Sequence, residues 1–181
     1  MLFVGRLVPH KGVDALIEAL PAGVGLDVVG PPLDPAYIDQ LHVLAGDRDV
    51  AFHHDWDDAR LVRGYQECLC TVLPSVYRDR YGGATNVPEL VGQTLLESMA
   101  CGRPVICTPV GGMPEIVRAG VTGMIVPERD RRALAAAIRE LHGDAAAADR
   151  MGLAGREHAV REHRWEQVVE RCLRAYARAS R

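Results

Sequence analysis

Two positively charged side chains lie near the start of the 181-residue chain, in a segment with a glycine at each end. The segment runs from Gly5 to Gly12 and contains Arg6 and Lys11, and a helix is expected to begin at about Val13. Flexible backbone that carries cations beside a helix N-terminus favours an anion, most naturally a phosphate group. Taken alone, the segment fits a solvated turn with two surface charges equally well.

The segment matches neither common phosphate-binding motif. The dinucleotide pattern GxGxxG is absent, and in place of the Ser or Thr of a GxxxxGK[ST] loop, Gly12 follows Lys11. Lys11 is also the only lysine among the 21 Lys and Arg residues. A genome-composition bias explains the many arginines but not the one lysine that remains. A compact ammonium on a flexible stem differs chemically from a planar guanidinium, which makes Lys11 a candidate functional residue.

A second group of chemically interesting residues begins at Glu89. Pro88 and Gly92 disfavour a helix that starts at Glu89, so this residue is expected in a loop, and the helix is expected over Thr94–Cys101 with Gly102 as its cap. Leu95, Leu96 and Met99 would form the buried face of that helix.

The predicted start of this helix offers unpaired amides to a ligand. Amides around Gly92–Thr94 can hold a phosphate or a sugar oxygen. Glu89 lies before these amides, and Glu97 follows about one turn into the helix, so the two carboxylates could accept hydrogen bonds from vicinal hydroxyls, as in a ribose and a hexose. For an isolated pair of acids, ordinary complementation of the helix dipole is the favoured alternative.

Short apolar segments alternate with helical segments along most of the chain. Continuous apolar strands are typical of a parallel sheet covered on both faces, so the alternation predicts an α/β fold with a doubly wound, Rossmann-like parallel sheet. Ligands of such sheets bind at the carboxyl ends of the strands, near the switch in strand order. The expected strands are Leu2–Gly5, Leu26–Gly30, Val50–Phe52, Leu69–Leu73, Pro104–Thr108 and Gly123–Val126. The expected helices between them are Val13–Leu20, Pro35–Ala45, Asp57–Glu67, Thr94–Cys101, Met113–Arg118 and Arg131–Leu141.

Two helices without a strand between them, Ala145–His163 and Trp165–Ala179, are expected to complete a single domain over residues 1–181. Gly143 is expected to end the preceding helix in a left-handed conformation. The first strand begins at residue 2, which suggests a chain cut from, or working beside, something larger.

Composition excludes several classes of protein. The formal net charge of −3 argues against a nucleic-acid binder dominated by phosphate contacts. No apolar segment is long enough for a membrane span, and the start lacks the order of a signal peptide. The five cysteines are odd in number and contain no CxxC pair, which suits reduced thiols in the cytoplasm better than disulfides or a zinc site.

Two further patterns have alternative interpretations. Gly111 and Gly112 either let the backbone approach a ligand or form the turn into a helix opened by Pro114, and the second is favoured. The segments 55–57 and 47–49 both match a DxD metal motif. Since chance supplies this motif so readily, no metal site is expected.

In combination, these segments resemble a known family. Residues 5–12 resemble the opening of the C-terminal domain of retaining glycosyltransferases with two Rossmann-like domains, the GT-B class, and specifically glycosyltransferase family 4. Residues 89–106 are similar to that family's ExxxxxxxE segment, and residues 111–117 and 120–127 complete the pattern. The order and spacing of the blocks extend over essentially the whole chain.

The resemblance implies a domain that binds a nucleotide-diphosphate sugar without a cofactor or metal. Arg6 and Lys11 would hold the diphosphate and neutralise the leaving group, Glu89 would contact hydroxyls of the sugar, and Glu97 would contact the ribose. These implied roles make Arg6, Lys11 and Glu89 the candidate catalytic residues. The candidate donor-binding residues are Gly5, Gly92, Gln93, Thr94, Leu95 and Glu97.

The chain departs from the family at two places. Val91 stands where the family commonly has an aromatic residue, so packing near the sugar is expected to differ. The segment Val76–Pro88 is longer than its family counterpart, and it either caps the donor, meets a partner, or is a mobile surface loop. The nucleotide base is expected near residues 53–55.

The function implied is that of one half of a retaining, metal-independent, cytoplasmic hexosyltransferase. An N-terminal acceptor domain, absent from this chain, would act in cis or in trans, and any peripheral membrane association would run through that domain. The chain alone is expected to bind a nucleoside diphosphate but to transfer sugar poorly or not at all. An exposed apolar face on Trp165–Ala179 would fit the missing neighbour. The alternative is a non-catalytic nucleotide-sugar-binding module or one subunit of a split transferase.

Overall fold

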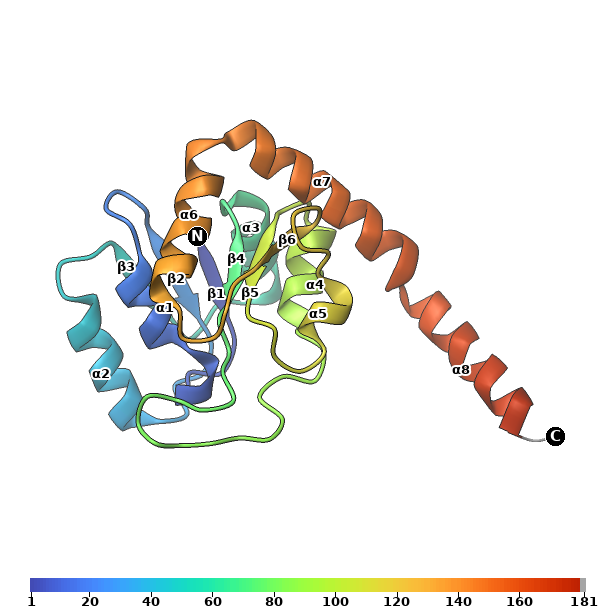
Figure 1. Ribbon diagram of the computed structural model, residues 1–181, viewed down its shortest axis with the longest axis horizontal. Helices are drawn as coiled ribbons and strands as arrows, with labels where there is room; N and C mark the ends of the chain where they lie inside the picture. The colour runs from blue at the N-terminus through green and yellow to red at the C-terminus, as the bar shows by residue number, and fades with distance from the viewer. Residues whose placement is uncertain (180–181) are drawn as a thin grey trace.

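The centre of the protein is a six-stranded sheet in which every strand is parallel to its neighbours. The computed structural model describes residues 1–179, and its strands lie in the order β3-β2-β1-β4-β5-β6 (Figure 1). This arrangement confirms the predicted doubly wound, Rossmann-like fold. The strands are β1 (Leu2–Val4), β2 (Leu26–Val29), β3 (Val50–His53), β4 (Thr71–Leu73), β5 (Val105–Cys107) and β6 (Gly123–Ile125).

Helices cover both faces of this sheet. One layer contains α1, α2 and α6, and the other contains α3, α4 and α7 (Figure 1). The helices are α1 (Val13–Ala19), α2 (Pro35–Ala45), α3 (Asp58–Glu67), α4 (Gln93–Ala100), α5 (Met113–Ile116), α6 (Arg131–Gly143), α7 (Ala145–Glu162) and α8 (Trp165–Ala179), and a 3-10 turn, η1 (Pro9–Lys11), precedes α1.

The apolar character of the central strands follows from their burial on both faces. Every residue of β4 and β5 is buried, whereas the edge strand β3 is only partly covered. Because the backbone of a parallel strand pairs on both sides, the side chains on its two faces can all be aliphatic without leaving polar groups unpaired. The sheet thereby supplies a rigid base for the loops at its edge.

The strand order reverses between β1 and β4, which are neighbours in the sheet but far apart in the sequence. The connections after β1 and β4 therefore leave the same edge of the sheet side by side, at the position where ligands of doubly wound sheets bind. The Arg6–Lys11 loop follows β1, and the segment that leads to Glu89 follows β4. The topology thus brings the two groups of candidate residues together.

The prediction that Gly143 caps a helix in a left-handed conformation is wrong. Gly143 is the last residue of α6, and it is not among the glycines with positive φ. Asp144 separates α6 from α7 and serves as the N-cap of α7, because its carboxylate accepts a hydrogen bond from the Ala147 amide at 2.9 Å. With this cap the chain turns without a left-handed residue. The predicted cap at Gly102, by contrast, is confirmed by its φ of 77°.

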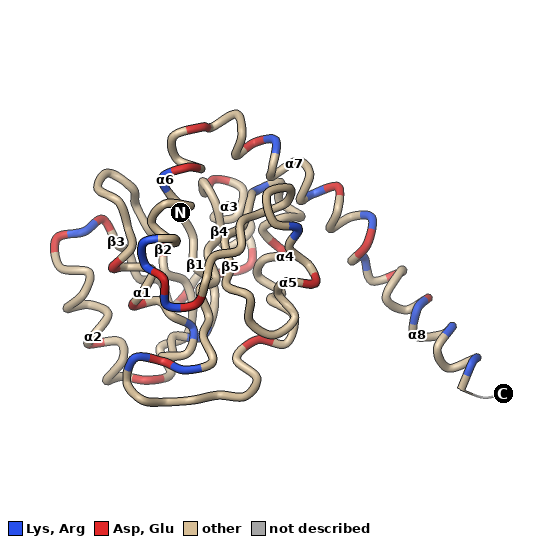
Figure 2. Tube along the Cα trace, in the orientation of Figure 1, with Lys and Arg blue, Asp and Glu red and all other residues tan. Residues whose placement is uncertain are grey.

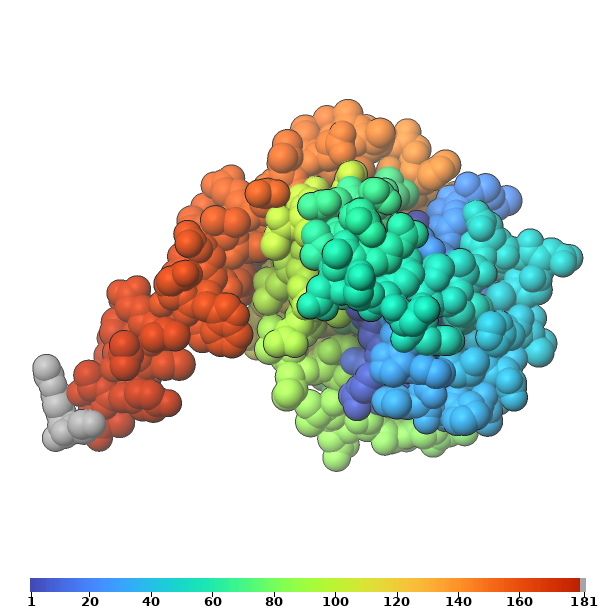
Figure 3. Space-filling view, turned by 180° about the vertical axis from the view of Figure 1, so that it is seen from behind, coloured from blue at the N-terminus to red at the C-terminus, as the bar shows by residue number. Residues whose placement is uncertain are grey.

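Helix α8 projects away from the rest of the molecule (Figures 1 and 3). None of its described side chains is buried, and acidic and basic residues alternate along α7 and α8 (Figure 2). Four large apolar residues repeat at helical spacing and are exposed, so α8 carries an apolar face. They are Trp165, Val169, Leu173 and Tyr176. Within residues 1–179, no helix combines the length and apolar character that a bilayer crossing requires.

Candidate functional site

A cavity of about 510 Å³ opens at the carboxyl edge of the sheet, where β1 and β4 end. The loop after β1 forms one wall, and the segment that leads into α4 forms the other. Seven of the predicted site residues line it. They are Gly5, Arg6, Lys11, Glu89, Gly92, Gln93 and Thr94.

Lys11 is held in place by the local fold around Gly12. Gly12 adopts a φ of 70°, and a Cβ atom at this position would lie 2.2 Å from the Pro74 carbonyl oxygen. Glycine therefore allows η1 to pack closely against the end of β4, since an L side chain there would be strained and would also collide with backbone. This contact carries the Lys11 side chain across to the segment after β4.

Lys11 and Glu89 form an ion pair at the wall of the cavity. The Lys11 ammonium donates hydrogen bonds to the Glu89 Oε1 atom and, at 3.3 Å, to the Pro88 carbonyl oxygen. Ser75, two residues beyond the end of β4, donates its hydroxyl to the same carboxylate oxygen at 2.9 Å. The two charged side chains are each 10% exposed. Ser75 was not among the predicted site residues, because a hydroxyl two residues beyond a buried strand is a weak signal in a sequence.

Two cations and one carboxylate line the cavity. Arg6 lies exposed at the cavity, beside the buried Lys11. His10 lies on the same loop, and its pKa falls below the ordinary value because of burial first, and then because of the charges of Lys11 and Arg6. Burial and the two cations thus both disfavour the protonated form of His10, against the opposing charges of Glu89 and Asp79.

The start of α4 presents unpaired amides to the cavity. Gly92 precedes the helix with a φ of 79° and supplies no side-chain cap. In residues 1–179 the amides of Gly92, Gln93 and Thr94 have no hydrogen-bond acceptor, and the Thr94 hydroxyl is buried without a partner. The Leu95 amide, in contrast, donates to the Gly92 carbonyl oxygen at 2.9 Å. Three helix-start donors thus remain for a ligand.

Two predicted donor-binding residues lie outside the lining of the cavity. Leu95 is fully buried in the hydrophobic core. Glu97 is exposed one turn into α4, and its Oε2 atom accepts a hydrogen bond from the Tyr65 hydroxyl of α3 at 2.6 Å. Burial, and then the bond to Glu97, raise the pKa of Tyr65, so this phenol remains a donor. The role of Glu97 toward a ribose stays a prediction.

Gly111 and Gly112 pack against the backbone that carries Glu89. A Cβ atom at Gly111 would lie 1.8 Å from the Glu89 carbonyl oxygen, and one at Gly112 would lie 2.3 Å from that of Leu90. The pair also leads directly into α5 at Met113, as the favoured alternative predicted. The close approach that these glycines permit is therefore between two segments of this chain, and it fixes the position of Glu89.

The long segment 76–88 is anchored on both sides. Its Arg80 guanidinium forms ion pairs with Glu18 of α1, and the Tyr77 amide donates to Glu128 at 2.9 Å. The Tyr77 hydroxyl accepts a hydrogen bond from the Gly111 amide at 3.0 Å. Only Val87 of this segment lines the cavity. Residues 76 and 78–80 instead lie beside α1.

The residues expected near the nucleotide base, 53–55, include two histidines that contact β2 and the residue after it. The His53 ring is 2.7 Å from Asp27, and the His54 ring is 2.8 Å from the Gly30 carbonyl oxygen. In the DxD-like segment, Asp57 caps α3 by accepting a hydrogen bond from the Arg60 amide at 2.7 Å. The described part of the chain contains no group of three or more His, Cys, Asp or Glu residues arranged to hold a metal ion.

The fold and the cavity define a Rossmann-like α/β domain with a cationic site at its topological switch point. The chain belongs to the family described as glycosyl transferases group 1, whose pattern it matches over residues 1–158.

Two curated relatives and one solved structure illustrate the similarity. The chain is 34% identical to the alpha-maltose-1-phosphate synthase of Mycobacterium tuberculosis, over 97% of this chain and 46% of that protein. It is 35% identical to a GDP-mannose-dependent alpha-(1-6)-phosphatidylinositol monomannoside mannosyltransferase of the same organism, over 92% of this chain and 44% of that protein. The sucrose-phosphate synthase of Thermosynechococcus elongatus superposes with a TM-score of 0.82 at 30% identity, over 98% of this chain and 44% of that one. The chain thus spans less than half the length of these relatives.

Proposed function

We propose that this chain is the donor-binding half of a retaining glycosyltransferase of the GT-B class, family 4, and that it binds a nucleotide-diphosphate sugar. One observation carries the proposal: Lys11, Arg6 and the free amides of α4 line the same cavity as the Glu89 carboxylate. Cations and amides suit a diphosphate, whereas a carboxylate suits the hydroxyls of a sugar. A nucleotide-diphosphate sugar carries both kinds of group in one molecule.

The charges suggest how bond breaking would be assisted. When the bond between the sugar and the diphosphate breaks, negative charge grows on the phosphate oxygens, and Arg6 and Lys11 would stabilise it. An ammonium group has three donors, so Lys11 retains one for a phosphate oxygen while it contacts Glu89 and the Pro88 carbonyl. Two fixed cations would serve in place of a divalent metal.

A partner domain is part of the proposal. The relatives are more than twice as long as this chain, and α8 projects with an exposed apolar face. We infer that an N-terminal acceptor domain, in cis or in trans, covers the cavity and this face. The chain alone would then bind the donor without transferring its sugar.

Calorimetric titration of the chain with UDP, GDP, ADP and dTDP tests the binding step. We expect saturable one-to-one binding of at least one of them, and the strongest identifies the base. Arg139→Ala, which changes an exposed cation on α6 outside the cavity lining, is the matched control and should bind as the parent chain does. Failure of all four nucleotides to bind at millimolar concentration would overturn the proposal.

Replacement of Lys11 by arginine tests whether charge alone is sufficient. The Lys11 side chain is buried between Glu89 and the Pro88 carbonyl, where a planar guanidinium has neither the same volume nor the same directions of donation. We expect Lys11→Arg to weaken nucleoside diphosphate binding by roughly tenfold, the loss of about one charge-assisted hydrogen bond. Arg139→Lys is the control. If Lys11→Arg binds as tightly as the parent chain, the single lysine is a compositional accident.

The pKa of His10 should report the occupation of the site. Burial and the charges of Lys11 and Arg6 depress this pKa in the unliganded chain. A bound diphosphate offsets those charges and favours the protonated ring, so we expect the His10 pKa to rise on binding. By linkage, nucleotide affinity should increase as the pH falls through the His10 pKa of the complex. NMR titration of the ring resonances measures both effects, and an unchanged pKa in a saturated complex would place the phosphates elsewhere.

A further inference from the structure

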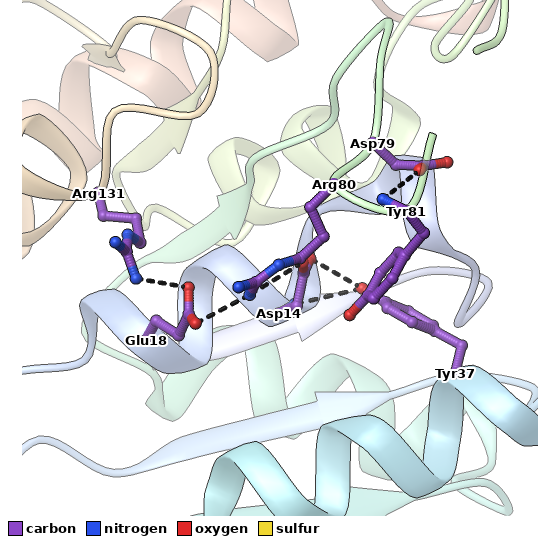
Figure 4. Close-up of polar contacts among 7 residues, drawn as sticks. All are labelled: Asp14, Glu18, Tyr37, Asp79, Arg80, Tyr81 and Arg131. Carbon is purple, nitrogen blue, oxygen red and sulfur yellow. Dashed lines mark hydrogen bonds and ion pairs between the residues drawn. The ribbon is translucent and has the colours of Figure 1, made fainter. Parts of the chain in front are cut away.

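A second cavity of about 390 Å³ lies on the other side of η1, and it shares no lining residue with the donor cavity. Its walls come from α1, the segment 76–88 and the start of α6 (Figure 4). Four arginines line it, together with three carboxylates. The arginines are Arg78, Arg80, Arg129 and Arg131, and the carboxylates are Asp14, Glu18 and Asp79.

Two of the arginines are already neutralised. Glu18 accepts hydrogen bonds from Arg80 at 2.8 Å and from Arg131 at 2.9 Å, so that it joins the segment 76–88 to α6 (Figure 4). Asp14 lies 3.6 Å from Arg80 and accepts the Tyr37 hydroxyl at 3.1 Å. These contacts hold the walls of the cavity together.

The third carboxylate is satisfied within its own turn. One oxygen of Asp79 accepts the amides of Tyr81 and Gly83, each at 2.9 Å. A backbone bridge between Arg78 and Ala84 closes the same turn. Backbone donors thus hold this oxygen of Asp79, and in the described part of the chain the carboxylate forms no ion pair with an arginine.

Two guanidinium groups remain without a partner. In residues 1–179 neither Arg78 nor Arg129 forms an ion pair or a side-chain hydrogen bond. Arg129 is also the only non-glycine residue of the described chain with a positive φ, at 60°. Strained backbone of this kind is held by its surroundings and is concentrated at functional sites. Two unpaired cations, one of them on strained backbone, therefore face one cavity.

We propose that this cavity binds a phosphate monoester of a small molecule, with Arg78 and Arg129 as its principal donors. A guanidinium group presents paired donors, and a phosphate monoester, with three terminal oxygens and a charge of about −2, can balance two such cations where a single carboxylate balances one. The cavity volume lies within the range of small-molecule sites. The site is separate from the donor cavity and does not rest on the donor-binding proposal.

The test is an NMR titration of the isotope-labelled full chain with inorganic phosphate and with glucose 6-phosphate, carried out both without a nucleotide and with UDP or GDP present. We expect the amides of residues 78–83 and 128–131 to shift saturably with glucose 6-phosphate and not with glucose. Arg129→Gly tolerates the positive φ and removes the side chain, and Arg78→Gln preserves a polar side chain. Each should weaken glucose 6-phosphate binding by about tenfold or more. Arg132→Ala, one residue beyond the cavity lining, is the control and should leave binding unchanged.

Vesicles distinguish the source of the phosphate. Retention of the chain on phosphatidylcholine vesicles that contain phosphatidic acid, lost in Arg129→Gly, would assign the site to a lipid phosphate. Shifts with glucose 6-phosphate without such retention would assign it to a free phosphorylated molecule. The proposal is overturned if neither probe binds, if both arginine variants bind as the parent chain does, or if the shifts are confined to residues 92–94.

Discussion

Lys11→Ala is expected to weaken nucleoside diphosphate binding by about 100-fold or more. The substitution removes a charge-assisted hydrogen bond to the phosphates and leaves the Glu89 carboxylate, with only the Ser75 hydroxyl as its donor, facing them. Both effects act in the same direction, and a loss of about 3 kcal/mol corresponds to about two orders of magnitude in affinity. Calorimetric titration of the variant with the nucleotide that the parent chain binds most tightly measures this loss of affinity.

The same substitution should destabilise the fold, and a double variant separates the two effects. Removing one partner of a buried ion pair costs roughly 3 kcal/mol, because the remaining charge is left uncompensated. Lys11→Met combined with Glu89→Gln removes both charges, so we expect most of the stability to return while binding remains weak. If the double variant recovers both stability and nucleotide affinity, the lysine acts only through the fold.

Gly111→Ala is expected to damage both stability and sugar recognition. The residue has a φ of 55°, and the added Cβ atom would lie 1.8 Å from the Glu89 carbonyl oxygen. Because the obstacle is backbone, the segment that carries Glu89 must move. We expect a loss of about 3 kcal/mol in the free energy of unfolding, or a fall of about 6–12 °C in Tm. The extra affinity of a nucleotide sugar over the free nucleoside diphosphate should also shrink.

Gly120→Ala is the matched control for this prediction. Gly120 has a similar positive φ of 75°, but an added Cβ atom there would meet nothing within 4 Å. The left-handed strain alone should cost about 1 kcal/mol, with no effect on ligands. Thermal unfolding followed by circular dichroism compares the two variants. Equal losses would mean that the contact between Gly111 and Glu89 does not position the site.

The fold could be predicted because apolar strands and amphipathic helices alternate with little interruption. The location of the site followed from topology, since the loops after β1 and β4 must meet wherever the strand order reverses. Spacing alone could not show that Lys11 contacts Glu89, 78 residues away. Parallel sheets create such long-range contacts, and only the strand order reveals them.

The features of the structure that could not be predicted from the sequence are those that depend on tertiary contacts. Glu97 could be placed one turn into α4, but not against Tyr65 of α3, because helix periodicity gives no information about the neighbouring helix. The segment 76–88 contains no periodic pattern, and its path is set by ion pairs between Arg80 and α1. The predicted cap at Gly143 is wrong because the side chain of the next residue, Asp144, caps the following helix instead. In each case the local sequence allowed more than one arrangement, and contacts with other parts of the fold determined which one forms.

A crystal structure of the chain with the nucleoside diphosphate that it binds most tightly would show whether the phosphates occupy the cavity between Lys11 and α4. We expect diphosphate oxygens within hydrogen-bond distance of the Lys11 ammonium and of the Gln93 and Thr94 amides, with Arg6 closing over them. A nucleotide whose phosphates lie away from this cavity, for example against Arg78 and Arg129, would contradict this expectation.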